Sequence, residues 1–139
     1  MDIVTPEQRS AIMAKIGPRN TAPELAVRRA LHRMGYRFRL HRPDLPGKPD
    51  IVLPRYRTAI LVHGCFWHRH PGCRFAYNPK SRLAFWTRKF EKNVSRDLKV
   101  RRELEEGGWM VHVVWECETE DSKELQRRLR QLLRTAGRP

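Results

Sequence analysis

Residues 60–73 read Ile-Leu-Val-His-Gly-Cys-Phe-Trp-His-Arg-His-Pro-Gly-Cys. The apolar run from Ala59 to Val62 predicts a buried strand. The residues that follow change in character at once, because they hold three histidines, two cysteines and an adjacent Phe-Trp pair. The whole chain has only six histidines and three cysteines. Such a density in one short window needs a chemical explanation.

The explanation that we favour is a metal. Cys65, His70 and Cys73 are spaced for a tight loop around Zn²⁺, which prefers thiolate and imidazole in a tetrahedral shell. Cys117 is the one other cysteine and would complete a closed, structural site. The spacing alone is not diagnostic, since free cysteines also pack as small buried hydrophobic residues. A disulfide is disfavoured because three is an odd number and no signal peptide is visible.

Composition points to a polyanionic partner. The chain has 139 residues, with 29 Lys and Arg against 15 Asp and Glu, which gives a net charge of +14. Such a charge favours nucleic acid over a merely basic, soluble surface, although charge alone does not identify an enzyme. The length predicts a single domain over residues 1–139. No membrane-spanning run or targeting segment is visible, so we expect a cytoplasmic protein without a membrane partner.

Hydrophobic periodicity predicts one mixed sheet flanked by helices, an α/β fold. The helix expected at about residues 5–17 begins with Thr5-Pro6, and a second begins at Thr21 with Glu24 in a capping box. Further elements are expected as strands at 36–41, 50–53, 58–62 and 109–115 and helices at 82–106 and 121–133, with an irregular segment at 71–81. In the helix at 82–106 the spacing predicts Phe90, Val94 and Leu98 toward the core.

The mouths of the central strands carry polar groups suited to a magnesium site. Asp50 enters one strand and offers the hard carboxylate oxygen that Mg²⁺ prefers. A backbone carbonyl near Val62 on the neighbouring strand is a second candidate ligand. His63 and His68 lie close enough in sequence to flank the same place, and histidine is suited to proton transfer near neutral pH.

Asp97 is a second acidic residue of interest, after Asp50. The helical pattern places it on the inward face of its helix. It lies seven residues after Phe90 and three after Val94. A buried aspartate needs a partner, and a histidine that it orients would be one. An ion pair with Arg101, four residues on, explains the same residue equally well.

With these residues in view, the chain resembles the very-short-patch-repair (Vsr) DNA mismatch endonucleases. The resemblance runs from about Arg9 to Leu132, and its central string His63-Gly64-Cys65-Phe66-Trp67-His68 is highly specific. The other matching pieces are Arg9-Ser10-x-x-Met13-x-x-Ile16, Thr21-x-x-Glu24, Leu45-Pro46-Gly47-x-Pro49-Asp50, Phe85-Trp86, Asn93-x-x-Arg96-Asp97, and Gly108-Trp109 through Trp115-Glu116-Cys117.

The resemblance implies a restriction-endonuclease-like fold and a Mg²⁺-dependent enzyme that nicks one strand at a T·G mismatch in double-stranded DNA. Such mismatches arise where 5-methylcytosine deaminates, so a cytosine-5 DNA methyltransferase is the implied genetic partner. It also implies that Asp50 binds Mg²⁺ with the backbone of Val62, and that His68, held by Asp97, acts at the scissile phosphate. Glu24 and His63 would complete the active-site set. The structural zinc ligands would be Cys65, His70, Cys73 and Cys117.

The resemblance also gives the aromatic residues a role. Phe66, Trp67 and Trp86 match residues that wedge into the duplex beside the mismatch, and Met13 matches one inserted from the other groove. The helix at about 5–17 would then be a DNA-contacting arm. Unstacking costs least at a mismatch, and apolar wedges offset it. Core packing is the alternative for each of these residues, above all for Met13 on its helix face.

Two departures and two alternatives accompany the resemblance. Relatives can carry threonine at the position of Val62, so only its backbone could serve as a ligand here. The loop His70-Pro71-Gly72-Cys73 is the second departure, because it can be one residue longer than in some relatives. The lysine usual in restriction-type sites is also missing, and His63 occupies that neighbourhood, which is itself a feature of the family. The alternatives are a zinc-stabilised DNA-binding module without catalysis and a nuclease with another DNA target. We expect the protein to be a monomer.

Overall fold

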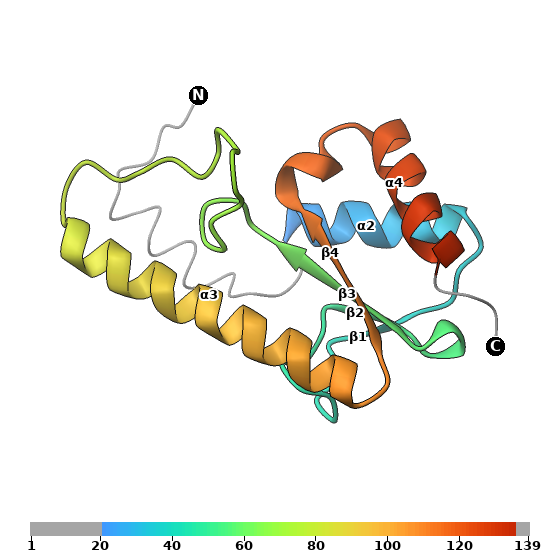
Figure 1. Ribbon diagram of the computed structural model, residues 1–139. Helices are drawn as coiled ribbons and strands as arrows, with labels where there is room; N and C mark the ends of the chain where they lie inside the picture. Colours follow the sequence, from blue (N-terminus) through green and yellow to red (C-terminus); the bar gives the residue numbers. More distant parts are fainter. Residues whose placement is uncertain (1–20, 136–139) are drawn as a thin grey trace.

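The computed structural model describes residues 21–135. The helix expected at 5–17, and Met13 with it, lie outside this range. The described elements are α2 (Ala22–Arg33), β1 (Arg39–Leu40), β2 (Ile51–Leu53), β3 (Thr58–His63), α3 (Leu83–Glu106), β4 (Met110–Trp115) and α4 (Ser122–Thr135), with 3₁₀ turns η1 (Pro54–Tyr56) and η2 (Glu116–Thr119). This order is the one that the periodicity predicts (Figure 1).

The strands form one mixed sheet in the order β1-β2-β3-β4. The pairs β1–β2 and β2–β3 are antiparallel, whereas β3 and β4 run parallel. A parallel pair needs a long crossover connection, and α3 supplies it. The expectation of a mixed α/β sheet flanked by helices is therefore confirmed for the described residues.

Helices cover both faces of the sheet. On one face α2 and α4 bury Val27, Leu31, Leu125 and Leu129 against residues of β2, β3 and β4. On the other face Leu104 of α3 packs on a smaller group that includes Ala59, Leu61 and Val111. The apolar residues that recur at helical spacing in α2 and α4 are thus the ones that the core uses. Among the described residues, no helix is long and apolar enough to cross a membrane.

The residues at both ends of α2 are the ones that begin and end a helix. The side chain of Thr21 accepts a hydrogen bond from the backbone N–H of Glu24 (3.4 Å) and caps the helix. Gly35 follows the C-terminus with φ +83°, a left-handed conformation that costs glycine little.

Two expectations about these elements are wrong, one about the strand at 36–41 and one about the inward face of α3. The strand expected at 36–41 is only Arg39–Leu40, and the side chain of Leu40 is exposed. In α3, Leu98 is 66% exposed and Val94 is exposed as well. Phe90 and Asp97 are half-buried, as expected, and the less exposed side of this helix also includes Asn93 and Leu104.

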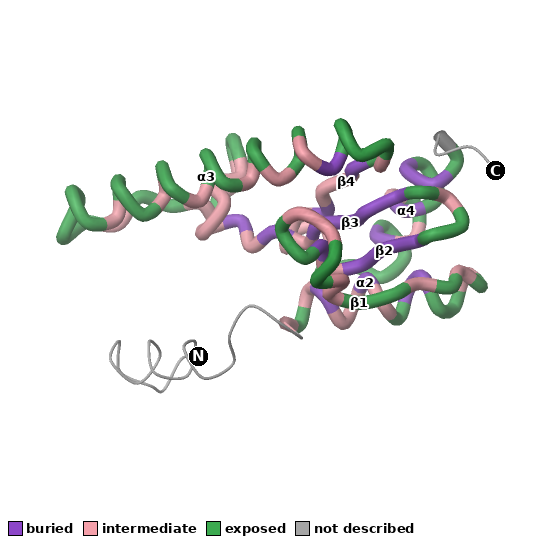
Figure 2. The backbone as a smooth tube through the Cα atoms, turned by 90° about the horizontal axis from the view of Figure 1, so that it is seen from below, coloured by how far each residue is buried: buried purple, intermediate pink, exposed green. Residues whose placement is uncertain are grey.

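The expectation followed the apolar residues of α3, but apolar character does not identify the side of this helix that faces the protein. Asn93 and Asp97 turn inward because they hydrogen-bond to the loop after β3. Their spacing continues to Val100 and Leu104, which reach the sheet. Figure 2 shows the first turns of α3 exposed and extending beyond the sheet, with its C-terminal part above it.

We therefore expect Leu104→Ala to lower the free energy of unfolding by about 2–5 kcal/mol, because it leaves a cavity between α3 and the sheet. Leu98→Ala, on the same helix, should change stability by no more than about 0.5 kcal/mol. Denaturant unfolding of the two variants measures both. Equal losses would mean that the buried face of α3 has been misassigned.

Candidate active site and metal centre

Asp50 sits at the mouth of β2, where the antiparallel pairing brings it beside the end of β3. The register pairs Ile51 with Ile60, so Asp50 lies next to the last residues of β3. Its Oδ2 accepts a hydrogen bond from the backbone N–H of Val62 (2.8 Å). The two residues expected to share a site are thus in contact, although the contact that the structure records uses the N–H of Val62.

The electrostatics of Asp50 favour a cation beside it. Burial raises the pKa of this carboxyl to about 6, and the nearby charge of Glu24 acts in the same direction. The bond from Val62 and the charges of His41 and His68 lower the pKa but do not cancel the cost of burial. A bound cation would offset that cost, and carboxylate oxygen is a donor that Mg²⁺ prefers.

His68 is held from α3. Its Nδ1 lies 2.6 Å from Oδ2 of Asp97, a residue that helical spacing places on the inward face. Of the two partners considered for Asp97, the structure therefore shows the histidine, whereas Arg101 pairs with Glu105. With Nδ1 bound to the carboxylate, Nε2 is the ring nitrogen left to face a substrate.

His63 lies against His68. The two rings stack with centroids 4.0 Å apart. Burial lowers the pKa of His63 to about 4, with a smaller effect in the same direction from the His68 charge. His63 is therefore neutral near pH 7, so the stacked pair does not have to hold two positive charges.

Glu24 reaches the same place from α2. Its carboxylate is buried, and Oε1 accepts from Nη2 of Arg28 (2.7 Å) and lies 2.5 Å from Nε2 of His41. One ligand atom from each of Glu24, His41 and Asp50 lies within 4.8 Å of the others. Glu24 thus combines a place in the capped first turn with a buried contact at the site.

His41 joins this candidate site, although sequence reasoning missed it. Its backbone N–H donates to the carbonyl oxygen of Asp50 (3.2 Å), which brings the two residues together across β1 and β2. Its own backbone is left-handed, with φ +46°. The available signal was a histidine at the end of the strand expected at 36–41, followed along the chain by Asp50 at the start of the next expected strand.

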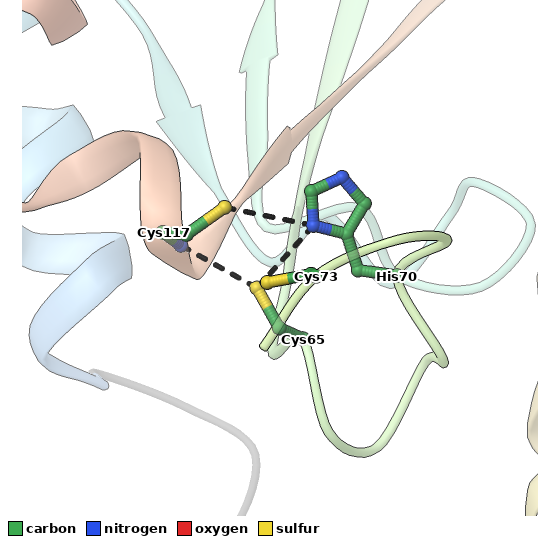
Figure 3. A group of neighbouring side chains, drawn as sticks. All are labelled: Cys65, His70, Cys73 and Cys117. Carbon is green, nitrogen blue, oxygen red and sulfur yellow. Dashed lines mark hydrogen bonds between the residues drawn. The ribbon is translucent and has the colours of Figure 1, made fainter. Parts of the chain in front are cut away.

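A second group of side chains has the arrangement of a zinc site. Cys65, His70, Cys73 and Cys117 converge from the loop after β3 and from η2 (Figure 3). Nδ1 of His70 lies 3.6 Å from Sγ of Cys65 and 3.5 Å from Sγ of Cys117. Tetrahedral Zn²⁺ with ordinary bond lengths would separate sulfur and nitrogen ligands by about 3.6 Å. The four residues fit the metal.

The backbone holds these ligands in place. The N–H of His70 donates to the carbonyl oxygen of Cys65 (3.0 Å), and that of Cys73 donates to His70 (3.3 Å), so tight turns join three of the ligands. The N–H of Cys117 points at Sγ of Cys65 (3.4 Å). Burial raises the pKa of the Cys65 thiol to about 12. A metal would overcome this cost, because thiolates bind Zn²⁺ only when deprotonated.

Aromatic residues gather beside this loop. We define the aromatic cluster as Phe66, Trp67, Trp86 and Phe90. The ring of Phe66 lies 5.2 Å from Trp67, 5.5 Å from Trp86 and 5.2 Å from Phe90. Core packing and a DNA wedge were the two interpretations of these residues. The structure shows them half-buried against one another and α3, away from the two sheet cores.

The sequence is similar to known proteins over most of its length. The family model described as DNA mismatch endonuclease Vsr matches residues 1–74. A type II nicking enzyme, V.XorIIP of Xanthomonas oryzae pv. oryzae, is 52% identical over 95% of this chain and 96% of its own length. The chain belongs to the Vsr family. As a member of this family it is an endonuclease, as expected from the motifs.

Other Vsr-family relatives agree with this assignment. The type II nicking enzyme V.NmeAIP of Neisseria meningitidis serogroup A is 44% identical over 96% of this chain and 94% of its own length. The DNA mismatch endonuclease Vsr of Escherichia coli K12 is 42% identical over 84% of this chain and 74% of its own length. The similarity therefore extends well beyond the residues that the family model matches.

Proposed function

We propose that this protein cleaves one strand of double-stranded DNA next to a T·G mismatch, with Mg²⁺ as its catalytic cofactor. The observation that carries the proposal is a half-buried carboxylate, Asp50, flanked by two histidine–carboxylate pairs in a Vsr-family chain. The mismatches in its DNA substrate would arise from deaminated 5-methylcytosine. This origin links the protein functionally to a cytosine-5 DNA methyltransferase. We propose a cytoplasmic monomer with a restriction-endonuclease-like core.

The residues that would hold Mg²⁺ are Asp50 and the backbone carbonyl of Val62. Support comes from the half-buried Asp50 carboxylate, whose pKa is raised, and from its contact with Val62. When bound, the metal would polarise the scissile phosphate and help to activate water. Glu24 carries a second buried carboxylate toward the same place, oriented by Arg28 and His41.

The proton transfer at the scissile phosphate is proposed for His68. Asp97 fixes its ring through Nδ1, which selects the tautomer and the direction in which Nε2 points. His63 stacks on the ring of His68 and stays neutral, so it packs against His68 without adding a second positive charge. Neutral histidine accepts a proton and its charged form returns one, within the ordinary pH range.

Structural zinc and duplex wedging complete the proposal. Zn²⁺ would be held by Cys65, His70, Cys73 and Cys117, with no open position for chemistry. Phe66, Trp67 and Trp86 would enter the base stack beside the mismatch, where unstacking costs least. Met13 would enter from the other groove. The clustering of the three rings next to His68 supports this role, because a wedge must act close to the bond that is cut.

The substrate is tested by a strand-specific nicking assay with Mg²⁺. Duplexes would carry one T·G mismatch, a T·A pair or a C·G pair in several sequence contexts. We expect one nick beside the mismatched thymine and intact paired controls. Cleavage of another duplex would change the target, and tight binding without cleavage in any context would identify a binding module in place of an enzyme.

The role of Asp50 is tested by Asp50→Asn, which keeps the shape and the acceptor for the Val62 N–H. We expect nicking to fall by at least about a hundredfold, because a neutral amide is a poor ligand for Mg²⁺. Asp44→Asn is the matched control, since Asp44 is an exposed acid that pairs with Arg42 in the preceding loop. Retained activity in Asp50→Asn would exclude this carboxylate as the metal ligand.

The zinc assignment is tested by Cys117→Ala, which removes one of four ligands. We expect loss of bound zinc and a lower melting temperature, since metal binding at a structural site contributes to folding. Thr119→Ala in the same 3₁₀ turn is the control, because its hydroxyl only donates to the Glu116 carbonyl oxygen. Metal analysis and thermal unfolding give the result, and a zinc-bound variant that melts normally would refute the assignment.

A further inference from the structure

Arg69 lies between His68 of the candidate active site and His70 of the candidate metal centre. Its side chain belongs to neither of these groups. Its Nη1 donates to the carbonyl oxygens of Phe66 (3.4 Å) and Tyr77 (3.1 Å). Its Nη2 donates to the carbonyl oxygen of Ala76 (3.0 Å) and to Oδ1 of Asn78 (2.9 Å). One guanidinium thus joins the start of the loop after β3 to a segment ten residues further on.

The same guanidinium packs on the aromatic cluster. Its central carbon lies 4.1 Å from the ring centroid of Phe90 and 5.8 Å from that of Phe66. A cation over an aromatic face is attracted to the ring. Arg69 therefore contacts α3 through Phe90 and contacts both ends of the loop through hydrogen bonds. Its backbone is left-handed, with φ +54°, which turns its side chain away from those of its neighbours.

The loop between β3 and α3 needs side-chain contacts of this kind to hold its conformation. Between β3 and α3 the structure contains no helix or strand, so the carbonyl groups of residues 64–82 cannot be satisfied by a regular ladder. The first turns of α3 extend beyond the sheet, as Figure 2 shows. The aromatic cluster joins this part of α3 to the loop, and Arg69 supplies the polar contacts on the loop side.

We propose that Arg69 is a positioning residue that keeps the aromatic cluster assembled in the free protein. Its role in mismatch binding rests on the proposed function: rings ordered in advance lose less conformational freedom when they meet DNA. The residue acts on binding through Phe66, Trp67 and Trp86 and does not take part in bond cleavage.

The geometry requires arginine. Four acceptors lie around one plane, and the guanidinium fork directs an N–H group at each while its face lies over Phe90. A lysine keeps the charge but is a compact ammonium with three donors and no planar face. A contact of Arg69 with a DNA phosphate would need only the charge. Lysine therefore separates the two explanations.

The first test uses the free protein and the indole N–H signals of its tryptophans in ¹H–¹⁵N spectra. In Arg69→Met, which keeps most of the side-chain volume, we expect the signals of Trp67 and Trp86 to shift or broaden. The signal of Trp109, which lies against Arg57 on the other side of the fold, should stay in place. Unchanged signals of Trp67 and Trp86 would overturn the proposal.

The second test measures binding and turnover on the mismatched duplex. We expect Arg69→Met to raise Kd and KM by about tenfold, equivalent to about 1.4 kcal/mol, with kcat within about twofold of wild type. Arg69→Lys should share the defect. Arg74→Met is the matched control, because it removes an equal charge from the same loop and its guanidinium lies over Phe75. Full rescue by lysine, or an equal defect in Arg74→Met, would assign Arg69 to phosphate contact.

A separate variant covers the case in which Arg69→Met does not fold. Asn78→Ala removes one acceptor of the guanidinium on an exposed residue. The signals of Trp67 and Trp86 should shift in the same sense, by less, and their constancy would count against the proposal. Because these spectra need no DNA, a wild-type protein that fails to nick T·G duplexes would refute the proposed function and leave the result on Arg69 intact.

Discussion

Strands β3 and β4 run parallel and in register, from Thr58 paired with Met110 to His63 paired with Trp115. Both strands therefore end at the same edge of the sheet, and the segments that follow them leave side by side. Cys65 follows one strand and Cys117 the other, so two candidate zinc ligands far apart in sequence become neighbours. The crossover through α3 returns Asp97 to the same edge, where His68 meets it. The parallel pair thus positions both the candidate metal centre and the candidate active site.

Three buried or half-buried carboxylates at this edge each have a histidine close by, although the chain as a whole carries an excess of 14 positive charges. Glu24 has His41 and Arg28, and Asp97 has His68. Asp50 has only the charges of His41 and His68 at longer range, together with one backbone N–H, and its pKa is raised. It is therefore the carboxylate with the most to gain from a cation. The positive charge of the chain as a whole would attract DNA, while this group of carboxylates would attract a metal cation.

Local patterns in the sequence were sufficient wherever one interaction decides the structure. The capped start of α2, the glycine at its end and the apolar stripes of α2 and α4 follow from spacing, because each depends on residues within a few positions. The face of α3 was predicted only in part. Spacing placed Asp97 inward correctly, but it also placed Val94 and Leu98 inward, because the inward position of the polar Asn93 depends on its hydrogen bond to the loop. His41 was missed for a related reason. Its contact with Glu24 spans two elements, which periodicity within one element does not reveal.

The sequence His68-Arg69-His70 shows how closely the parts of this site depend on one another. His68 bonds Asp97 on α3, Arg69 bonds the carbonyl groups of the loop, and His70 meets the cysteines and stacks on Trp115. Three consecutive side chains therefore engage the candidate active site, the aromatic cluster and the candidate metal centre. Helix α3 holds this segment at two neighbouring points, because Asn93 donates to the carbonyl oxygen of Trp67 and Asp97 binds His68. The rings proposed to enter the duplex and the histidine proposed for cleavage are thus placed by the same helix.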